Sequence, residues 1–409
     1  MRVLIIAQYF PPDMGGGATR AFNAAKGLKA NGCDVVVVAA FPHYPTGNIP
    51  REYRWRIVRV EHVDGIKVIR TFVPPLASRG LANRMVLFLS FIVSSLLALP
   101  FVGRVSIVWA ANPNILSAFP ALVFSLLKRC PFVLNVDDLW PEDLYALGLL
   151  REGSMISRVA ELLAKFIYNK ASLITPISPG YVRVIVSKYG VNPRKIRVVR
   201  AGVDLSKFKS LGEKYSGKRH FTVLYSGSFS IAYDFDQVLE AARLLKECED
   251  IEFVLQGGGE LAAYIKRRVR ELGLSNVKVI DRILSREEVV KILSEADVLL
   301  LPLRDFGRPY LGISSKLYEY QAAGKPIICC AEGQPADYIK ETESGIVVKP
   351  GDYESLAKAV LYLKENRNIA EKLGASGRRY IENLTIEKIG SQIVSNFNEI
   401  LKRSCRVRK

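Results

Sequence analysis

The stretch RVLIIAQYFPPDMGGGATRAFNAAKGLKANGCDVVVVAA, residues 2–40, holds two apolar runs on either side of a helical pattern. The runs RVLIIA (2–7) and DVVVVAA (34–40) are continuous and rich in β-branched residues, which is typical of strands buried on both faces. Between them, apolar residues recur at helical spacing as far as Leu28, and Gly32 follows as a glycine that ends a helix. This order predicts a βαβ unit and therefore a parallel sheet.

The same alternation of apolar runs and helical patterns continues through the rest of the chain. A polar, glycine-containing stretch at 201–220 divides it into two halves, so we expect a linker there. Further strands are expected at IKVIRTF (66–72), SIVWAA (106–111), FVLNVDD (132–138), SLITPIS (172–178), IRVVR (196–200), FTVLYSGS (221–228), IEFVLQGGGE (251–260), VKVID (277–281), ADVLLLPL (296–303), KPIICC (325–330) and GIVVKP (345–350). We therefore predict an α/β protein with two facing Rossmann-like domains, 1–204 and 205–385, followed by an amphipathic helix within 386–409.

Length and charge narrow the classes of function. A chain of 409 residues with 49% hydrophobic residues is long enough for two globular cores. A net charge of +18 suits phosphorylated ligands, anionic lipid or nucleic acid, but the concentrated Lys/Arg tract of a nucleic-acid module is missing, so we expect no nucleic-acid partner. The six cysteines form no C-x-x-C pair and the three histidines are scattered, which disfavours a metal site.

One apolar run, MVLFLSFIVSSLLALPFV (85–102), is flanked by Arg84 and Arg104. Its length is at the lower edge of what spans a bilayer, which is roughly 18 residues. Serines and Pro100 interrupt it, however, and a strand-like run follows. Three interpretations stay open: a buried core helix, a helix lying in a membrane interface, and a true membrane span.

Glycine clusters follow three of the expected strands. They are Gly15–Gly17, Gly227 with the neighbouring Ser228, and Gly257–Gly259. Glycines leave backbone N–H groups bare beside helix N-termini, an arrangement that favours an anion such as a diphosphate. The alternative is that each cluster is an ordinary turn between a strand and a helix.

The segment ADVLLLPLRDFGRPYLGISSKLYEYQAAGKPIICC (296–330) predicts a buried strand, a polar loop and a helix that begins near Ser314 and Ser315. Lys316 falls in the first turn of that helix, where a cation is unfavourable unless an anion lies nearby. Glu319 lies one turn further on, where a carboxylate facing the ligand accepts two ribose hydroxyls. The alternative for Glu319 is a solvated position on the helix surface.

Six blocks carry a resemblance to a known family: YFPPDMGGGATR, FPHYPTG, VDDLWPEDLYALG, ISPG, GVDLSKF and ISSKLYEYQAAGKPI. In this order they resemble the retaining GT-B glycosyltransferases of family 4, in particular the branch that builds surface polysaccharides. The resemblance implies a nucleotide-sugar donor held mostly by the second domain and an acceptor held mostly by the first. It also implies that no metal or other cofactor is needed, and that the terminal helix crosses back onto the first domain.

Carried over residue by residue, the resemblance makes Glu319 the second glutamate of the family's E-x7-E motif, which contacts the nucleotide ribose. The first glutamate is replaced by Leu311, so backbone amides of residues 312–314 are expected to contact the transferred sugar instead. The family's Arg and Lys after the first strand of the second domain are also absent. Lys316, Arg282 and Arg20 are the candidates to supply that charge, and we favour Lys316 because it adjoins a helix N-terminus. Donor contacts are thus expected from Gly15, Gly16, Gly17, Arg20, Gly227, Ser228, Gly257, Gly258, Arg282, Gly312, Ile313, Ser314, Ser315, Lys316 and Glu319.

Asp138, in DDLWPE, is expected at the end of a strand in the first domain. By the family's pattern it lies near the sugar and the acceptor and orients or deprotonates the acceptor hydroxyl. Asp137 and Glu142 are rival carboxylates, and a purely helix-capping aspartate is the structural alternative. We expect the catalytic residues to be Asp138, Lys316 and Glu319.

The sequence therefore predicts transfer of a sugar, with retention at the anomeric carbon, from a UDP- or GDP-linked donor to a glycan or lipid-linked acceptor. A basic chain that carries the apolar run 85–102 between two arginines predicts peripheral contact with anionic membrane, and we expect a cytoplasmic enzyme on the inner face of the cell membrane. A nucleotide-sugar epimerase on the same fold is one alternative. A membrane-associated binding protein that has lost catalysis is another, because the first glutamate and the Arg/Lys pair are missing.

Overall fold

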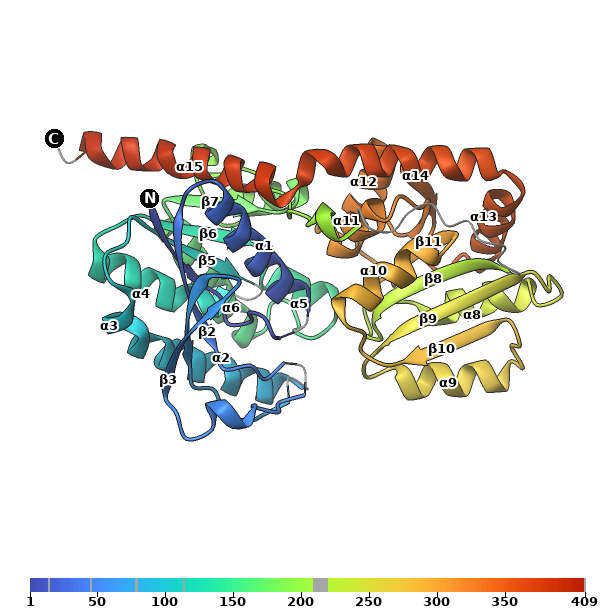
Figure 1. The fold of residues 1–409 in the computed structure, drawn as a ribbon, viewed down its shortest axis with the longest axis horizontal. Coiled ribbons are helices and arrows are strands. Elements are labelled where there is room, and N and C mark those ends of the chain that lie inside the picture. The colour runs from blue at the N-terminus through green and yellow to red at the C-terminus, as the bar shows by residue number, and fades with distance from the viewer. Residues whose placement is uncertain (14, 45, 78–79, 113–114, 209–219, 408–409) are drawn as a thin grey trace. The chain divides into compact units, whose positions relative to one another are not determined.

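The computed structural model describes residues 1–13, 15–44, 46–77, 80–112, 115–208 and 220–407 (Figure 1). The chain divides into two compact units. Unit 1 comprises Met1–Tyr145, Leu149–Gly202 and Ile386–Lys409, and unit 2 comprises Ala146–Gly148 and Val203–Thr385. The main boundary, after Gly202, falls at the start of the expected linker, of which residues 209–219 lie outside the described part of the chain.

Unit 1 is built on a sheet that, within the described residues, has seven strands. In spatial order they are β3 (Val58–Val63), β4 (Ile66–Thr71), β2 (Asp34–Ala40), β1 (Arg2–Ile6), β5 (Ile107–Asn112), β6 (Phe132–Val136) and β7 (Leu173–Pro176). All neighbouring pairs except β3 with β4 are parallel. The central strands are buried on both faces, as their unbroken apolar sequences predict.

The β3–β4 pair is an antiparallel hairpin that the sequence analysis missed. Its turn is Asp64–Gly65, and both residues have positive φ, +49° and +68°. Such a two-residue turn matches the right-handed twist of the flanking strands, which is why Asp-Gly is a strong hairpin signal. The dipeptide was therefore a readable clue to the antiparallel edge.

The prediction of a strand at residues 196–200 was wrong. Arg197 and Val199 donate backbone hydrogen bonds to Ile174 and Pro176 of β7, each at 3.0 Å, but only an isolated bridge at Ile196 results. Pro176 has no N–H, so β7 cannot donate the next backbone hydrogen bond that a parallel ladder requires. The segment is extended and tethered without becoming a strand.

The helices of unit 1 are arranged on the two faces of its sheet (Figure 1). Their bounds are α1 (Gly16–Ala30), α2 (Leu81–Ser95), α3 (Leu99–Val102), α4 (Ala118–Lys128), α5 (Glu142–Ala146), α6 (Met155–Lys170), α7 (Pro179–Ser187) and α15 (Ile386–Val407). From β1 to β2 the chain moves across the sheet in one direction, whereas from β4 through β5 and β6 to β7 it moves in the opposite direction. Because connections between parallel strands are right-handed, α1 lies on one face of the sheet and α2, α4 and α6 lie on the other. The helix α4 packs against both α2 and α6.

Helix α15 belongs to unit 1 and packs along α1 (Figure 1). Two glycines allow the close approach: a Cβ on Gly390 would lie 2.3 Å from the carbonyl oxygen of Gly27. The amide of Asn31 bridges the two helices, donating to the carbonyls of Gly27 and Glu387 at 2.8 and 2.9 Å. The buried face of α15 consists of Ile386, Ile389, Ile393, Phe397 and Ile400.

The apolar run at 85–102 forms α2, a 3₁₀ turn (Leu96–Ala98) and α3. Leu87, Phe91 and Ala98 are fully buried, whereas Leu89 and Val93 are 54% and 70% exposed. By length and composition Ala82–Val102 could cross a membrane, and a third of it is buried against the protein. It is therefore a surface helix with one packed side and one apolar exposed side.

Unit 2 is built on a sheet that has six parallel strands among the described residues. In spatial order these are β10 (Val277–Asp281), β9 (Ile251–Gly258), β8 (Phe221–Ser228), β11 (Val298–Pro302), β12 (Ile327–Cys330) and β13 (Gly345–Val348). The helices are α8 (Phe235–Leu244), α9 (Ala262–Glu271), α10 (Arg286–Glu295), α11 (Ser315–Ala322), α12 (Gln334–Thr342), α13 (Tyr353–Glu365) and α14 (Arg367–Ile381). Both units are thus Rossmann-like, with ligand sites expected at the carboxyl ends of the strands.

Candidate active site

The carboxyl ends of β8 and β9 in unit 2 are glycine turns with no room for side chains. A Cβ on Gly257 would lie 1.7 Å from the carbonyl oxygen of Gly227, and one on Gly259 would lie 2.5 Å from that of Phe229. Gly227 and Gly257 also have φ of +150° and +157°, a region that L-residues avoid. Gly258 and Ser228 follow in the same turns, where the hydroxyl of Tyr225 donates to the carbonyl of Ser228 at 2.6 Å. Backbone is therefore bare at this edge of the sheet.

Lys316 lies over the first of these turns. A Cβ on Gly227 would come within 2.1 Å of Lys316 Cε and 2.5 Å of Nζ, so the ammonium occupies the space that the glycine leaves open. Nζ lies 3.0 Å from the hydroxyl of Tyr233, and it also lies 4.8 Å from the centre of that ring. Among the described residues it forms no ion pair with a carboxylate. An ammonium held by neutral groups at a helix N-terminus is an anion-binding arrangement.

The residues before α11 complete this corner of unit 2. Ser314 is the N-cap by position, with extended backbone, but its hydroxyl makes no capping bond, and Ser315 opens the helix. Ile313 is buried and anchors the loop that contains Gly312. The hydroxyl of Ser314 and the first amides of α11 are therefore not used up by a side-chain cap.

Glu319 lies one turn beyond Lys316 on α11, and its carboxylate is ion-paired with Arg286. Nη1 of Arg286 donates to Oε1 of Glu319 at 2.8 Å, and the two side chains are 28% and 23% exposed. Arg286 is the first residue of α10, where Ser285 and Glu288 form a capping box. The sequence analysis missed Arg286, although the Ser-x-x-Glu pattern marked that helix start.

Arg282 is placed differently from Lys316. Its guanidinium pairs with Glu288 at 2.8 Å and is 64% exposed. Only its backbone is tied to the strand edge, because Gln256 donates to the carbonyl of Arg282 at 2.7 Å. Its role as a donor contact stays a prediction.

In unit 1, Arg20 joins the glycine turn to the aspartates that follow β6. From α1 its Nε lies 3.5 Å from Asp137 Oδ1, and its Nη2 lies 3.9 Å from Asp138 Oδ1. Asp137 is buried and also accepts from the amide of Asn135 at 2.8 Å. The guanidinium therefore offsets part of the negative charge of these two carboxylates, and the anion contact that the sequence predicted for Arg20 stays a prediction.

Asp138 is half-exposed, with 51% of its side chain accessible. Desolvation by the surrounding protein raises the pKa of Asp138 to about 6, Arg20 opposes the rise, and Asp137 adds to it. A carboxyl with a pKa near neutrality and an open face is suited to exchange a proton with a ligand hydroxyl. The rival Glu142 is engaged instead by Tyr189 and Lys188, its Oε1 lying 3.0 Å from Lys188 Nζ.

Asp143 is a further carboxyl of this cluster that the sequence analysis did not single out. Its Oδ2 accepts from the backbone N–H of Leu139 at 2.6 Å, which places it at the start of α5. Burial raises its pKa to about 8, and the neighbouring charge of Asp138 adds to the rise. Asp138 and Asp143 thus form a coupled pair that holds a proton at neutral pH.

This pair makes the stability of the protein depend on pH. The pKa of Asp143 in the folded protein lies above 3.8, its ordinary value. The protonated carboxyl therefore contributes its full stability below pH 3.8, and this contribution is lost as the pH rises to about 8. We expect the thermal midpoint to fall from about pH 5 to about pH 9, and to fall less in Asp143→Asn, whose amide oxygen still accepts from Leu139. Parallel pH curves for the two proteins in differential scanning calorimetry would contradict this assignment.

Polar side chains are also buried around the glycine turn of unit 1. Asp13 accepts from the backbone N–H groups of His43 and Tyr44 at 2.8 and 2.9 Å, and a Cβ on Gly15 would lie 3.1 Å from the ring of Tyr44. His43 Nδ1 lies 2.7 Å from the carbonyl of Phe41, so Nδ1 carries a proton and donates to this oxygen. Within the described chain, Asp13 Oδ2, His43 Nε2 and the amide of Gln8 have no partner. Gly16 and Gly17 open α1 beside this cluster.

Within the described residues, no group of three or more His, Cys, Asp or Glu side chains is arranged to hold a metal ion. The sequence expectation that no metal or cofactor is needed stays a prediction. The positive charge that the structure offers comes instead from Lys316 and the helix N-terminus beside it.

Comparisons with known proteins agree with this two-unit arrangement. The family model described as "Glycosyl transferase 4-like domain" matches residues 15–202, and the one described as "Glycosyl transferases group 1" matches residues 209–380. The solved structure of sucrose-phosphate synthase from Thermosynechococcus elongatus aligns with a TM-score of 0.78 at 18% identity, covering 98% of this chain and 99% of that one. This chain is a GT-B glycosyltransferase. The fold class expected from the sequence is thereby confirmed.

Two further proteins similar to this glycosyltransferase bear on its chemistry. "Probable glycosyltransferase WbjE" of Pseudomonas aeruginosa is 28% identical over 298 residues, which are 70% of this chain and 72% of WbjE. The structure of HepE from Anabaena in complex with UDP-glucose aligns with a TM-score of 0.68 at 15% identity, covering 98% of this chain and all of that one. The two matched family models fall on unit 1 and unit 2 in turn.

Proposed function

We propose that this glycosyltransferase transfers a sugar from a UDP- or GDP-linked donor with retention at the anomeric carbon. The observation that carries the proposal is the ammonium of Lys316 lying over Gly227 at the N-terminus of α11. The demanding step in such a transfer is departure of the nucleoside diphosphate, whose growing negative charge requires stabilisation. HepE, a structural relative, has been solved with UDP-glucose, which supports a nucleotide-linked donor here.

Unit 2 is proposed to bind the donor. The bare backbone of Gly257 and Gly258 and the amides at the start of α11 lie where phosphates and the transferred sugar need close approach. Glu319 is proposed to accept the ribose hydroxyls, which requires it to release Arg286. Because Leu311 replaces the family's first glutamate, the backbone of residues 312–314 takes over the contact with the sugar. No metal is needed in this scheme, since Lys316 supplies the charge.

Unit 1 is proposed to bind the acceptor, with Asp138 orienting its hydroxyl or accepting its proton. The raised pKa and half-exposed side chain of Asp138 support this role. We further propose a glycan or lipid-linked acceptor and peripheral contact with the inner face of the cell membrane, because the partly exposed apolar run at 85–102 is flanked by Arg84 and Arg104. The relatives are named glycosyltransferases, which favours transfer over epimerisation or a binding function.

The donor assignment is tested by calorimetric titration of UDP and GDP into Glu319→Ala. Loss of charge-assisted hydrogen bonds to the ribose should weaken the better nucleotide by roughly 10- to 100-fold. Arg286→Gln is the matched control, because it breaks the same ion pair but leaves the carboxylate free, so its affinity should be unchanged or higher. Both variants should melt close to the parent, since a partly exposed ion pair contributes at most about 1 kcal/mol. Equal affinities in Glu319→Ala and the parent would overturn the assignment.

A further inference from the structure

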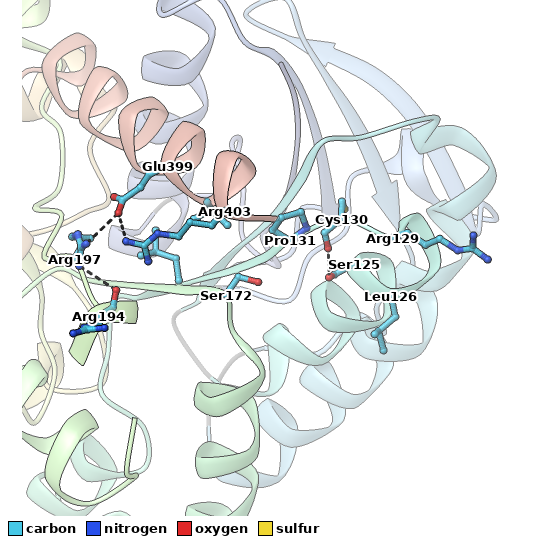
Figure 2. A pocket seen from close by; sticks show the side chains of 12 residues that line it. Ser125, Leu126, Arg129, Cys130, Pro131, Ser172, Arg194, Arg197, Glu399 and Arg403 are labelled. Atoms are coloured by element: carbon cyan, nitrogen blue, oxygen red, sulfur yellow. Dashed lines mark hydrogen bonds and ion pairs between the residues drawn. The ribbon is translucent and has the colours of Figure 1, made fainter. Parts of the chain in front are cut away.

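A pocket of about 620 Å³ opens in unit 1 at the end of the sheet where strands β6 and β7 begin (Figure 2). Pro131 directly precedes β6 and Ser172 directly precedes β7, so the pocket lies at the amino-terminal ends of these strands. Asp138 follows the other end of β6. The pocket is therefore separate from the residues of unit 1 that are proposed to bind the acceptor. Leu126 of α4 and Ile400 of α15 give it apolar walls.

One wall of the pocket is strongly cationic. Arg194, Arg197 and Arg403 line it, and Glu399 is the single carboxylate among the lining residues. Arg197 Nη2 lies 3.5 Å from Glu399 Oε1, and Arg403 pairs with the same carboxylate (Figure 2). With Arg129, four arginines and one carboxylate line the pocket, which leaves an excess of positive charge. Guanidinium groups bind phosphate oxygens through paired hydrogen bonds, so the chemistry of this wall suits a phosphate.

The pocket is continuous with an apolar layer formed by α2, α4 and α6. Leu126 lines the pocket and, with Leu127, is also exposed on α4. On α6 the exposed apolar residues recur at helical spacing, and they are Met155, Ile156, Val159, Leu162 and Phe166. The helices α2 and α6 flank α4, so these side chains extend the exposed apolar side of α2.

Nearly all charged side chains of this layer are cationic. Across residues 82–104, 115–129 and 155–170 the only carboxylate is Glu161, and it is bound by Lys188 at 2.8 Å. Cations, by contrast, lie beside the apolar residues, with Arg158 and Lys165 exposed on α6 and Arg129 exposed after α4. An apolar surface bordered by cations is complementary to an anionic bilayer surface.

The two units differ in how many large hydrophobic side chains they expose. Among the large hydrophobic side chains exposed in the described chain, all but Leu244, Ile283 and Tyr362 belong to unit 1. Isolated exposed apolar residues are normal on soluble proteins, whereas a contiguous group signals an interaction surface. The distribution therefore assigns the interaction to unit 1.

We propose that the arginine pocket, defined by Arg194, Arg197 and Arg403, binds the phosphate of an anionic lipid while the α2–α4–α6 layer rests in the bilayer interface. The proposal extends the membrane contact of the proposed function, which named α2 alone, and rests on it. The apolar walls of the pocket receive the lipid's glycerol and upper acyl groups, and the cationic wall receives its phosphate. A second copy of the chain is the competing occupant of the same face.

The test is co-sedimentation with phosphatidylcholine vesicles that contain or lack phosphatidylglycerol. Arg194→Gln/Arg197→Gln/Arg403→Gln should weaken binding to the anionic vesicles by about tenfold or more. Arg267→Gln/Arg270→Gln/Lys291→Gln, which removes the same charge from the exposed surface of unit 2, should change it by less than about threefold. Glu399→Gln should act in the opposite direction and tighten binding, because it frees two arginines of the pocket.

Three results would overturn the proposal. They are equal losses in the two triple variants, weaker binding in Glu399→Gln, and competition by free glycerol 3-phosphate as effective as that by vesicle lipid. A lipid-independent dimer in sedimentation velocity that is lost in Leu89→Glu/Ile92→Glu would instead assign the apolar layer to a second copy. UDP or GDP titration of each variant separates this outcome from failure of the proposed function, since donor binding by unit 2 should be unchanged throughout.

Discussion

Replacement of Lys316 by alanine should lower kcat by about a hundred- to a thousandfold, the loss typical of removing one preorganised group that stabilises charge in a transition state. The ammonium is fixed by Tyr233, 3.0 Å away, and by the absence of a side chain on Gly227. It therefore needs little rearrangement to meet a departing diphosphate. The affinity for the donor should fall much less, because the charge it stabilises grows as the bond breaks.

Steady-state kinetics with a saturating donor measures this effect, and Tyr233→Phe is the matched control. That variant removes the hydroxyl that contacts Lys316 but keeps the ring beneath the ammonium, 4.8 Å from its centre, so kcat should fall only a few-fold. A Lys316→Ala enzyme that keeps kcat within about threefold of the parent would remove Lys316 from the catalytic group.

Replacement of Gly390 by valine should destabilise unit 1 by about 3 kcal/mol, because the new Cβ would collide with backbone and not with a movable side chain. Its nearest atoms would be the carbonyl carbon and oxygen of Gly27, both at 2.3 Å. The two helices would then have to separate, which exposes the apolar face of α15. For a unit of this size, the thermal midpoint should drop by roughly 6–12 °C.

Ser391→Val is the control for this substitution. Ser391 is exposed and adjacent in α15, so the variant introduces the same β-branched side chain into this helix without the collision. Its midpoint should stay within about 2 °C of the parent, as is usual for an exposed site. If both variants melt together, the α1–α15 contact does not have the close geometry described above.

The strands were the most predictable part of the fold, because buried parallel strands have continuous β-branched sequences. The runs at 34–40 and 221–228, for example, became β2 and β8 with the expected bounds. The strand predicted at 196–200 did not form for a reason outside that run, because the missing N–H belongs to Pro176 in the neighbouring strand. The β3–β4 hairpin shows the reverse case, where the signal was the local turn at Asp64–Gly65.

The candidate site was predictable where chemistry was local. Lys316 was singled out because a cation in the first turn of a helix is unfavourable, and the structure places it over a glycine turn. Arg286 and Asp143 could not be found in the same way. Arg286 meets Glu319 across 33 positions in the sequence, and the raised pKa of Asp143 arises from burial and from Asp138. Such properties belong to tertiary packing, which a single sequence does not display.

The return of α15 to unit 1 has a consequence for how the protein is made. Apart from three residues, unit 2 is one continuous segment, Val203–Thr385, and the ribosome completes it before Ile386 is translated. Until then the surface of α1 at Gly27 lacks the helix that packs against it. The second unit synthesised is therefore the first that can finish folding, and nascent unit 1 depends on translation reaching α15.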